Sequence, residues 1–181
     1  MALDYKSYAP FVKKAQEVSS GIKNYALSKT PSMSAGLSVG NMVKRKTSTS
    51  KSSLGTETTS YGGSTRYEKF HPGVDIANSI GTPIPSMTAG TVVEAVTGRK
   101  QGDRGYGNYV VIKDQQGNLH RYSHLNDEYV KVGDPVEAGQ VFSSMGNSGS
   151  AYSTHGGTGS HLDYRVVDLA GKYLDPYQFL K

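Results

Sequence analysis

Short runs of β-branched and aromatic residues, separated by Gly, Asn and Asp, fill the chain from residue 62 onward. Runs of this kind are typical of strands bounded by turns. The sequence Gln115-Gln-Gly-Asn118 predicts a hairpin turn between two of them. We therefore predict an all-β domain, mainly antiparallel, with strands at residues 91–96, 109–112, 119–122, 141–142 and 162–167.

A different periodicity occupies residues 9–27. Apolar residues recur there at steps of three or four, which predicts an amphipathic helix, and a proline suits its first turn. The positions are Pro10, followed by Phe11, Ala15, Val18 and Ile22. Such a helix either packs on its own domain or docks on a partner protein. Residues 1–27 are therefore a predicted helical segment and a possible anchor.

The next segment is rich in hydroxyl side chains. Ten of the fourteen residues from Thr47 to Ser60 are Ser or Thr, and Lys44-Arg45-Lys46 precedes them. This composition predicts a flexible or partner-ordered linker. We place the linker at residues 28–61 and the β domain at residues 62–181.

Composition adds limits on location and partners. The chain has 181 residues and no cysteine, so disulfides and thiolate metal sites are excluded. No run has the length of a membrane span, and residues 1–30 lack the apolar stretch of a secretory signal. We expect export by another route, or transport as part of a larger particle. Residues 1–55 carry a charge balance of +7 and residues 56–181 one of −2. This basic tail, residues 1–55, could attract anionic surfaces. No nucleic-acid motif accompanies it, so we predict no specific nucleic-acid partner.

Two pairs of polar residues suggest a metal site. Side chains two residues apart in an extended segment share a face, so His161 and Asp163 would point the same way. His71 and Asp75 are four residues apart around a Pro-Gly pair, so a turn would bring them together. Imidazole and carboxylate are ordinary zinc ligands, and three of them with one open position form a catalytic zinc site. Any single histidine is more often an ordinary hydrogen-bonded residue than a ligand, and we keep that interpretation for His120 and His155.

These pieces resemble a known family. His71-Pro-Gly-Val-Asp75, Tyr122-Ser-His124-Leu and His161-Leu-Asp163 are similar to the motifs of lysostaphin/LytM-type zinc metallopeptidases, which cut peptidoglycan cross-bridges. Connecting segments occur in matching order over residues 62–181, among them Gly81-Thr-Pro-Ile-Pro, Gly105-Tyr-Gly-Asn108 and Gly146-Asn-Ser-Gly149. The resemblance implies the antiparallel β fold of that family and one zinc per chain.

The resemblance also implies residue roles. His71, Asp75 and Asp163 would hold the zinc, and His124 and His161 would be the catalytic residues that orient or deprotonate a water and stabilise the oxyanion. The family has histidine where this chain has Asp163. Two carboxylates cancel the charge of zinc, so we expect a less acidic bound water and a higher pH optimum than in relatives with the histidine.

Candidate substrate contacts surround these residues. Tyr67, or Tyr61, could donate to the oxyanion from upstream of His71. Residues 150–158 form a longer loop than is usual before the last motif, and we expect it to shape substrate access. His155, within this loop, either contacts substrate or has no role. The predicted substrate-binding residues are Tyr67, Asn108, Tyr122 and His155.

We therefore predict a zinc-dependent endopeptidase that hydrolyses peptide cross-links of bacterial peptidoglycan. The missing signal and the basic tail favour a bacteriophage tail component that acts at the bacterial wall as part of the virion, with residues 1–60 contacting tail or other particle proteins. A secreted autolysin would normally carry a signal. The alternative is a catalytically degenerate structural or peptidoglycan-binding module of a phage particle, in which Asp163 no longer holds metal.

Overall fold

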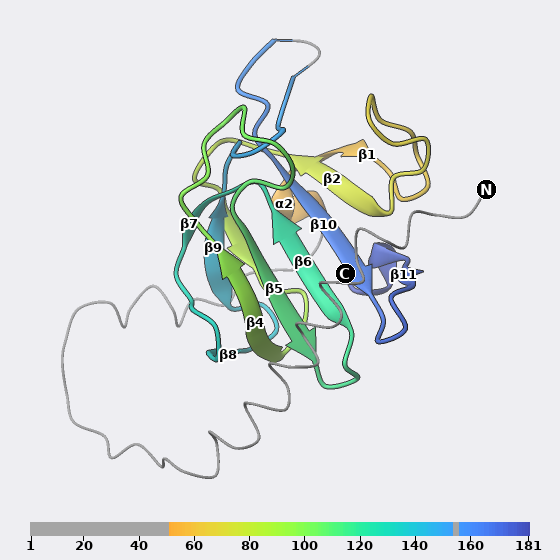
Figure 1. Cartoon of the computed structure of the whole chain (residues 1–181), viewed down its shortest axis with the longest axis vertical. Coiled ribbons are helices and arrows are strands. Elements are labelled where there is room, and N and C mark those ends of the chain that lie inside the picture. Colours follow the sequence, from red (N-terminus) through yellow and green to blue (C-terminus); the bar gives the residue numbers. More distant parts are fainter. Residues whose placement is uncertain (1–50, 154–155) are drawn as a thin grey trace, which may run out of the picture.

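The computed structural model describes residues 51–153 and 156–181 (Figure 1). The helix predicted at residues 9–27 lies outside the described residues. Within the described part, helix is limited to α2 (Lys51–Leu54) and the 3-10 turn η2 (Pro176–Gln178). No helix there is long and apolar enough to cross a membrane.

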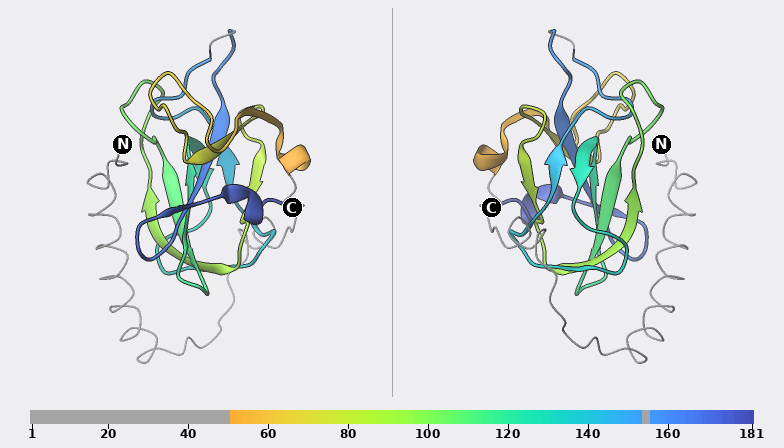
Figure 2. Two further views of the ribbon diagram at one scale, coloured as in Figure 1. Left: turned by 90° about the vertical axis from the view of Figure 1, so that its right-hand side faces the viewer. Right: turned by 90° about the vertical axis from the view of Figure 1, so that its left-hand side faces the viewer.

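Two antiparallel sheets make up the domain (Figures 1 and 2). The larger sheet has the order β1-β2-β10-β6-β5-β4-β8, with β11 paired to β10, and the smaller has the order β3-β9-β7. The strands are β1 (Thr56–Thr59), β2 (Gly73–Ala77), β3 (Pro83–Pro85), β4 (Gly90–Val96), β5 (Tyr109–Asp114), β6 (Leu119–Ser123), β7 (Leu125–Glu128), β8 (Pro135–Val136), β9 (Val141–Met145), β10 (His161–Val167) and β11 (Tyr173–Leu174). The predicted all-β, mainly antiparallel fold class is confirmed.

The predicted hairpin connects β5 and β6. Gly117 has φ of 89°, a conformation that favours glycine. The Asp114 carboxylate accepts hydrogen bonds from the backbone N–H and the side-chain amide of Asn118, at 2.7 and 2.9 Å. These local contacts fix the register of the two central strands, which pair Tyr109 with Ser123 at the other end.

The hydrophobic core contains side chains from both sheets. Tyr122 of the larger sheet meets Phe142 of the smaller, with ring centroids 4.8 Å apart. Alternate residues of β10, namely Leu162, Tyr164 and Val166, belong to this core. Because side chains alternate along a strand, His161, Asp163 and Arg165 lie on the opposite face of the larger sheet. The fold thus separates the core from the candidate site across a single strand.

The folded region begins earlier than predicted. Leu54 is a buried core residue, and β1 pairs with β2 through Thr56 and Ala77. Residues 51–61 therefore belong to the domain, and the predicted linker boundary at residue 61 is wrong. The Ser/Thr-rich composition misled the prediction because threonine is β-branched and suits an edge strand as well as a linker.

Candidate metal centre and active-site cleft

A cleft of about 1050 Å³ opens on the larger sheet where β2 and β10 meet the surrounding loops. Its walls carry every predicted ligand and both predicted catalytic histidines. Aromatic residues and further charged residues also line it. The residues concerned are His71, Asp75, His124, His161 and Asp163, with Tyr67, Tyr106, Tyr152, Glu68 and Arg165.

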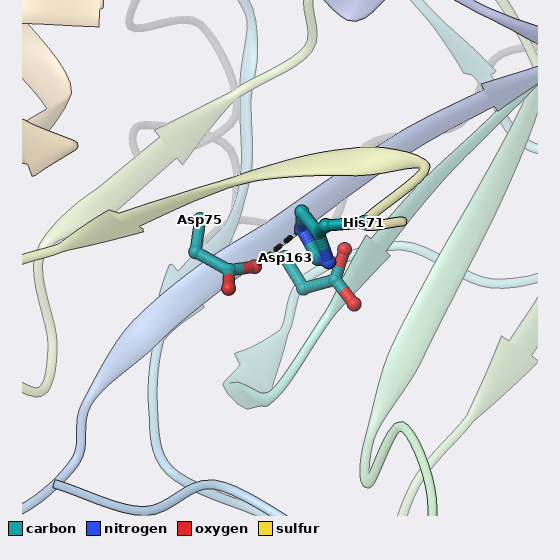
Figure 3. A group of neighbouring side chains, drawn as sticks. All are labelled: His71, Asp75 and Asp163. Carbon is teal, nitrogen blue, oxygen red and sulfur yellow. Dashed lines mark ion pairs between the residues drawn. The ribbon is translucent and has the colours of Figure 1, made fainter. Parts of the chain in front are cut away.

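The three predicted ligands come together in this cleft (Figure 3). His71 lies two residues before the start of β2, and Asp75 of β2 is the cross-strand partner of Asp163 in β10. One ligand atom from each of the three lies within 4.8 Å of the others. His71 Nε2 and Asp75 Oδ1 are 3.1 Å apart. This separation is close to the roughly 3.3 Å between two ligands of a tetrahedral zinc with bonds of about 2.0 Å.

Glycine at position 73 makes the close strand approach possible. A Cβ atom at Gly73 would lie 2.8 Å from Asp163 Oδ1 and 2.6 Å from Arg165 Cγ. Any larger residue would push against the carboxylate. Gly73 of the first motif therefore serves the close packing of β2 against β10. The turn expected between His71 and Asp75 is wrong, because Gly73 to Asp75 is extended in β2.

The hydrogen bonds of His71 fit a metal ligand. Its Nδ1 lies 3.0 Å from Glu68 Oε2, and a carboxylate can only accept, so Nδ1 carries the proton. Nε2 is buried without a hydrogen-bond partner and faces Asp75 Oδ1. Two acceptors face each other there, which requires a cation or a second proton between them. With no cation, burial opposes protonation, but Asp75 and Glu68 outweigh it and raise the pKa of His71 to about 9. A carboxylate that orients a ligating histidine is a usual feature of zinc sites.

Asp163 is buried and ionised. Burial alone would raise its pKa, but Arg165 and Arg121 lower it well below its usual range. Arg165 Nε donates to both carboxylate oxygens, at 2.8 and 3.0 Å. Each carboxylate oxygen has two acceptor sites, so one remains for a metal. The donor set of His71, Asp75 and Asp163 therefore fits a divalent cation such as zinc.

The two predicted catalytic histidines lie side by side, with ring centroids 4.5 Å apart. His124 Nδ1 lies 2.7 Å from the carbonyl oxygen of Ser148, and His161 Nδ1 lies 2.8 Å from that of Gly159. A carbonyl only accepts, so Nδ1 donates in both residues and Nε2 is left for the cleft. Burial and the neighbouring His161 lower the pKa of His124 to about 4, so this ring is neutral at pH 7.

Of the predicted substrate-binding residues Tyr67 and Asn108, only Tyr67 lines the cleft. Tyr67 is 64% exposed and lines the cleft, with its ring 6.2 Å from that of Tyr152. Asn108 is buried, accepts from the backbone N–H of Arg99 at 2.7 Å and donates to the carbonyl of Leu125 at 3.3 Å. These bonds give Asn108 a structural role, so its assignment as a substrate contact is wrong.

Two other residues predicted to contact the substrate, Tyr122 and Tyr61, do not line the cleft. Tyr122 is fully buried in the core, so its assignment as a substrate contact is also wrong. Tyr61 packs edge-on against Phe70 and is absent from the cleft walls. His155 lies outside the described residues.

Replacing Tyr122 with phenylalanine should lower stability without changing cleavage per folded molecule. The Tyr122 hydroxyl accepts a hydrogen bond from the backbone N–H of Met87 at 2.8 Å, and its removal leaves that buried N–H unpaired. We expect a loss of about 1–3 kcal/mol in the free energy of unfolding. Urea denaturation measures it, and a loss of cleavage at unchanged stability would restore the substrate role.

Sequence reasoning missed Glu68 and Arg165. Arg165 follows Asp163 by two residues, so the alternation that paired His161 with Asp163 could have placed it on the same face. Glu68 precedes His71 by three residues, but its contact with Arg165 spans 97 positions. No local pattern could have shown that contact.

Over part of its length the chain is similar to a lysostaphin and to a murein hydrolase activator. It is 35% identical over 115 residues to lysostaphin of Staphylococcus simulans, which covers 62% of this chain and 22% of lysostaphin. It is 33% identical over 113 residues to the murein hydrolase activator NlpD of Salmonella typhimurium, which covers 62% of this chain and 27% of that protein. The match thus spans well under two thirds of either relative.

The chain also resembles solved structures, and its sequence matches a family model. The structure of lysostaphin from Staphylococcus simulans superimposes with a TM-score of 0.56 at 28% identity, covering 74% of this chain and 52% of that one. The catalytic domain of a point mutant of the prophage-encoded M23 protein EnpA from Enterococcus faecalis gives 0.52 at 31% identity, covering 67% and 88%. Residues 69–176 match Peptidase family M23, and since this is more than half of the chain, the protein belongs to that family.

Proposed function

We propose that the chain is a zinc-dependent endopeptidase that hydrolyses peptide cross-links of bacterial peptidoglycan. The observation that carries the proposal is the buried Nε2 of His71, which faces Asp75 without a hydrogen-bond partner beside the carboxylate of Asp163. Two histidines with Nε2 available complete the cleft. The similarity to lysostaphin, an antimicrobial peptidase, supports a peptidase.

His71, Asp75 and Asp163 would hold the zinc. Zinc held by these residues would supply a Lewis acid that lowers the pKa of a coordinated water and polarises the scissile carbonyl. His124, neutral at pH 7, accepts the proton of the attacking water at Nε2. Peptide hydrolysis then requires a proton for the leaving amine, and a ring of the His124–His161 pair, once protonated, can donate it. A protonated ring also stabilises the oxyanion as it forms.

Digestion of purified peptidoglycan tests the activity. Walls with glycine-rich bridges and walls with direct D-alanyl cross-links should be compared, because the sequence favours neither. We expect new amino groups and, by mass spectrometry, cross-linked muropeptides cut at one peptide bond. A His161→Ala variant is the control for contaminating hydrolases. No new amino groups from any wall would contradict the proposal.

We further propose that the enzyme acts as part of a virion, at the tail, with residues 1–60 contacting other particle proteins. The basic tail, the predicted helix at residues 9–27 and the similarity to a prophage-encoded protein support this. Mass spectrometry of purified particles from the source phage should detect the chain. Its absence from particles that infect normally would contradict the location.

Two observations favour the degenerate alternative. Asp163 is already paired with Arg165, and one relative is named as an activator of murein hydrolases. A chain of this kind would bind peptidoglycan without releasing amino groups from it. Sedimentation with insoluble peptidoglycan, measured alongside the digestion, separates the two functions.

A further inference from the structure

The Arg165 guanidinium joins two carboxylates of the centre. Its Nε donates to both oxygens of Asp163, and its two terminal nitrogens donate to Glu68, Nη1 to Oε1 at 2.9 Å and Nη2 to Oε2 at 3.0 Å. Glu68 Oε2 also accepts from His71 Nδ1. A single buried side chain thus contacts one candidate ligand directly and the orienting partner of another.

These contacts restrict how the two ligands can turn. The paired hydrogen bonds to Glu68 are the planar fork geometry that guanidinium and carboxylate favour. With Glu68 held in this way, the His71 ring keeps Nδ1 toward Glu68 and Nε2 toward Asp75. The Nε bonds hold the Asp163 carboxylate on the side of Arg165, so its remaining acceptor sites are the ones open to a cation.

Charge gives Arg165 a second effect. The carboxylates of Glu68, Asp75 and Asp163 carry three negative charges close to one another, and the Arg165 guanidinium offsets one of them. Asp163 and Arg165 taken together are neutral, as a histidine ligand would be. Arg121, opposite Arg165 on β6, stacks over Tyr106 at 3.4 Å and also lowers the pKa of Asp163.

We propose that Arg165 is a positioning residue of the metal centre, and that Asp163 and Arg165 act as one unit in place of a neutral ligand. The inference rests on the proposed zinc function. It predicts that the identities of residues 163 and 165 are coupled: aspartate requires arginine, whereas histidine at position 163 works better without it. A salt bridge that only stabilised the fold would show no such coupling.

A double-mutant cycle tests this coupling. The chains are the native protein, Arg165→Met, Asp163→His and the double variant, with Arg99→Met as a control at an exposed arginine outside the cleft. Zinc affinity is measured by competition with a chelator, and the melting temperature is measured in EDTA. We expect Arg165→Met to weaken zinc binding about 10- to 100-fold, the usual loss when a residue supporting a ligand is removed. Arg99→Met should change nothing.

The decisive result is the double variant. Asp163→His alone should also weaken zinc binding, because Arg165 then adds a positive charge that no carboxylate at position 163 offsets. In the double variant, affinity should return to within a few-fold of native while the metal-free melting temperature stays reduced. If the native chain binds zinc and the losses of zinc affinity in the two single variants simply add in the double variant, the positioning role of Arg165 is overturned. The proposed function would then still stand. A native chain that binds no zinc would contradict the proposed function itself.

Discussion

Replacing His124 with alanine should abolish peptidoglycan cleavage and leave zinc bound, whereas replacing His71 should remove both. His124 contacts the carbonyl of Ser148 and the ring of His161 and is outside the ligand group, so its loss removes a proton acceptor but no ligand. Loss of a general base typically costs about 10²- to 10⁴-fold in rate. Loss of His71 removes the one nitrogen ligand.

Two measurements on the same preparations check this division. Zinc per chain, determined by elemental mass spectrometry, should be unchanged in His124→Ala and lost in His71→Ala, and release of amino groups should be absent in both. His120→Ala is a matched control, because His120 is buried in a separate contact with Asp114 and Tyr164. Equal zinc loss in the His71 and His124 variants would contradict the assigned roles.

Replacing Asp163 with alanine should have the second large effect. It should remove zinc, and it should lower the free energy of unfolding of the metal-free chain by about 3 kcal/mol, because a buried ion pair loses one partner. We expect the low end of the usual range because Glu68 still pairs with Arg165. Urea denaturation in EDTA measures the stability.

Asp163→Asn is the matched control for this experiment. The amide keeps the size of the side chain and one oxygen that can accept from Arg165, so it should lose less stability than alanine while still losing the anionic ligand. Zinc retained at full stoichiometry in Asp163→Ala would show that Asp163 is not a ligand. Unchanged stability in EDTA would show that its pairing with Arg165 contributes little.

All five predicted strands occur in the structure, but β2, with five residues, and the short strands were not predicted. Strands such as β5 and β10 combine β-branched residues with clear turn signals at their ends. By contrast, β8 and β11 have two residues each, too few to show a periodicity. Their pairing depends on neighbouring strands, and local sequence does not contain that information.

The candidate ligands were predictable, but the separation of His124 from Tyr122 was not. Tyr122 and His124 are two residues apart and would share a face in a regular strand. His124 has φ of 62°, however, and β6 ends at Ser123, so the chain turns and sends His124 into the cleft wall while Tyr122 stays in the core. A positive φ at a residue other than glycine is rare and was not foreseeable from this motif.

The expected rise in pH optimum depended on counting ligand charges alone. That count set two carboxylates against one zinc. Arg165, within 3.0 Å of both Asp163 oxygens, offsets one of those carboxylates. A higher pH optimum than in relatives with histidine therefore no longer follows from the ligand set.

The most direct test of the central claim is the zinc content of the native chain together with its effect on cleavage. The chain should contain about one zinc, as expected for three protein ligands and one open position. Removal by a chelator should stop the release of amino groups from peptidoglycan, and added zinc should restore it. A chain that holds no zinc after reconstitution, or that cleaves equally well without it, would contradict the account.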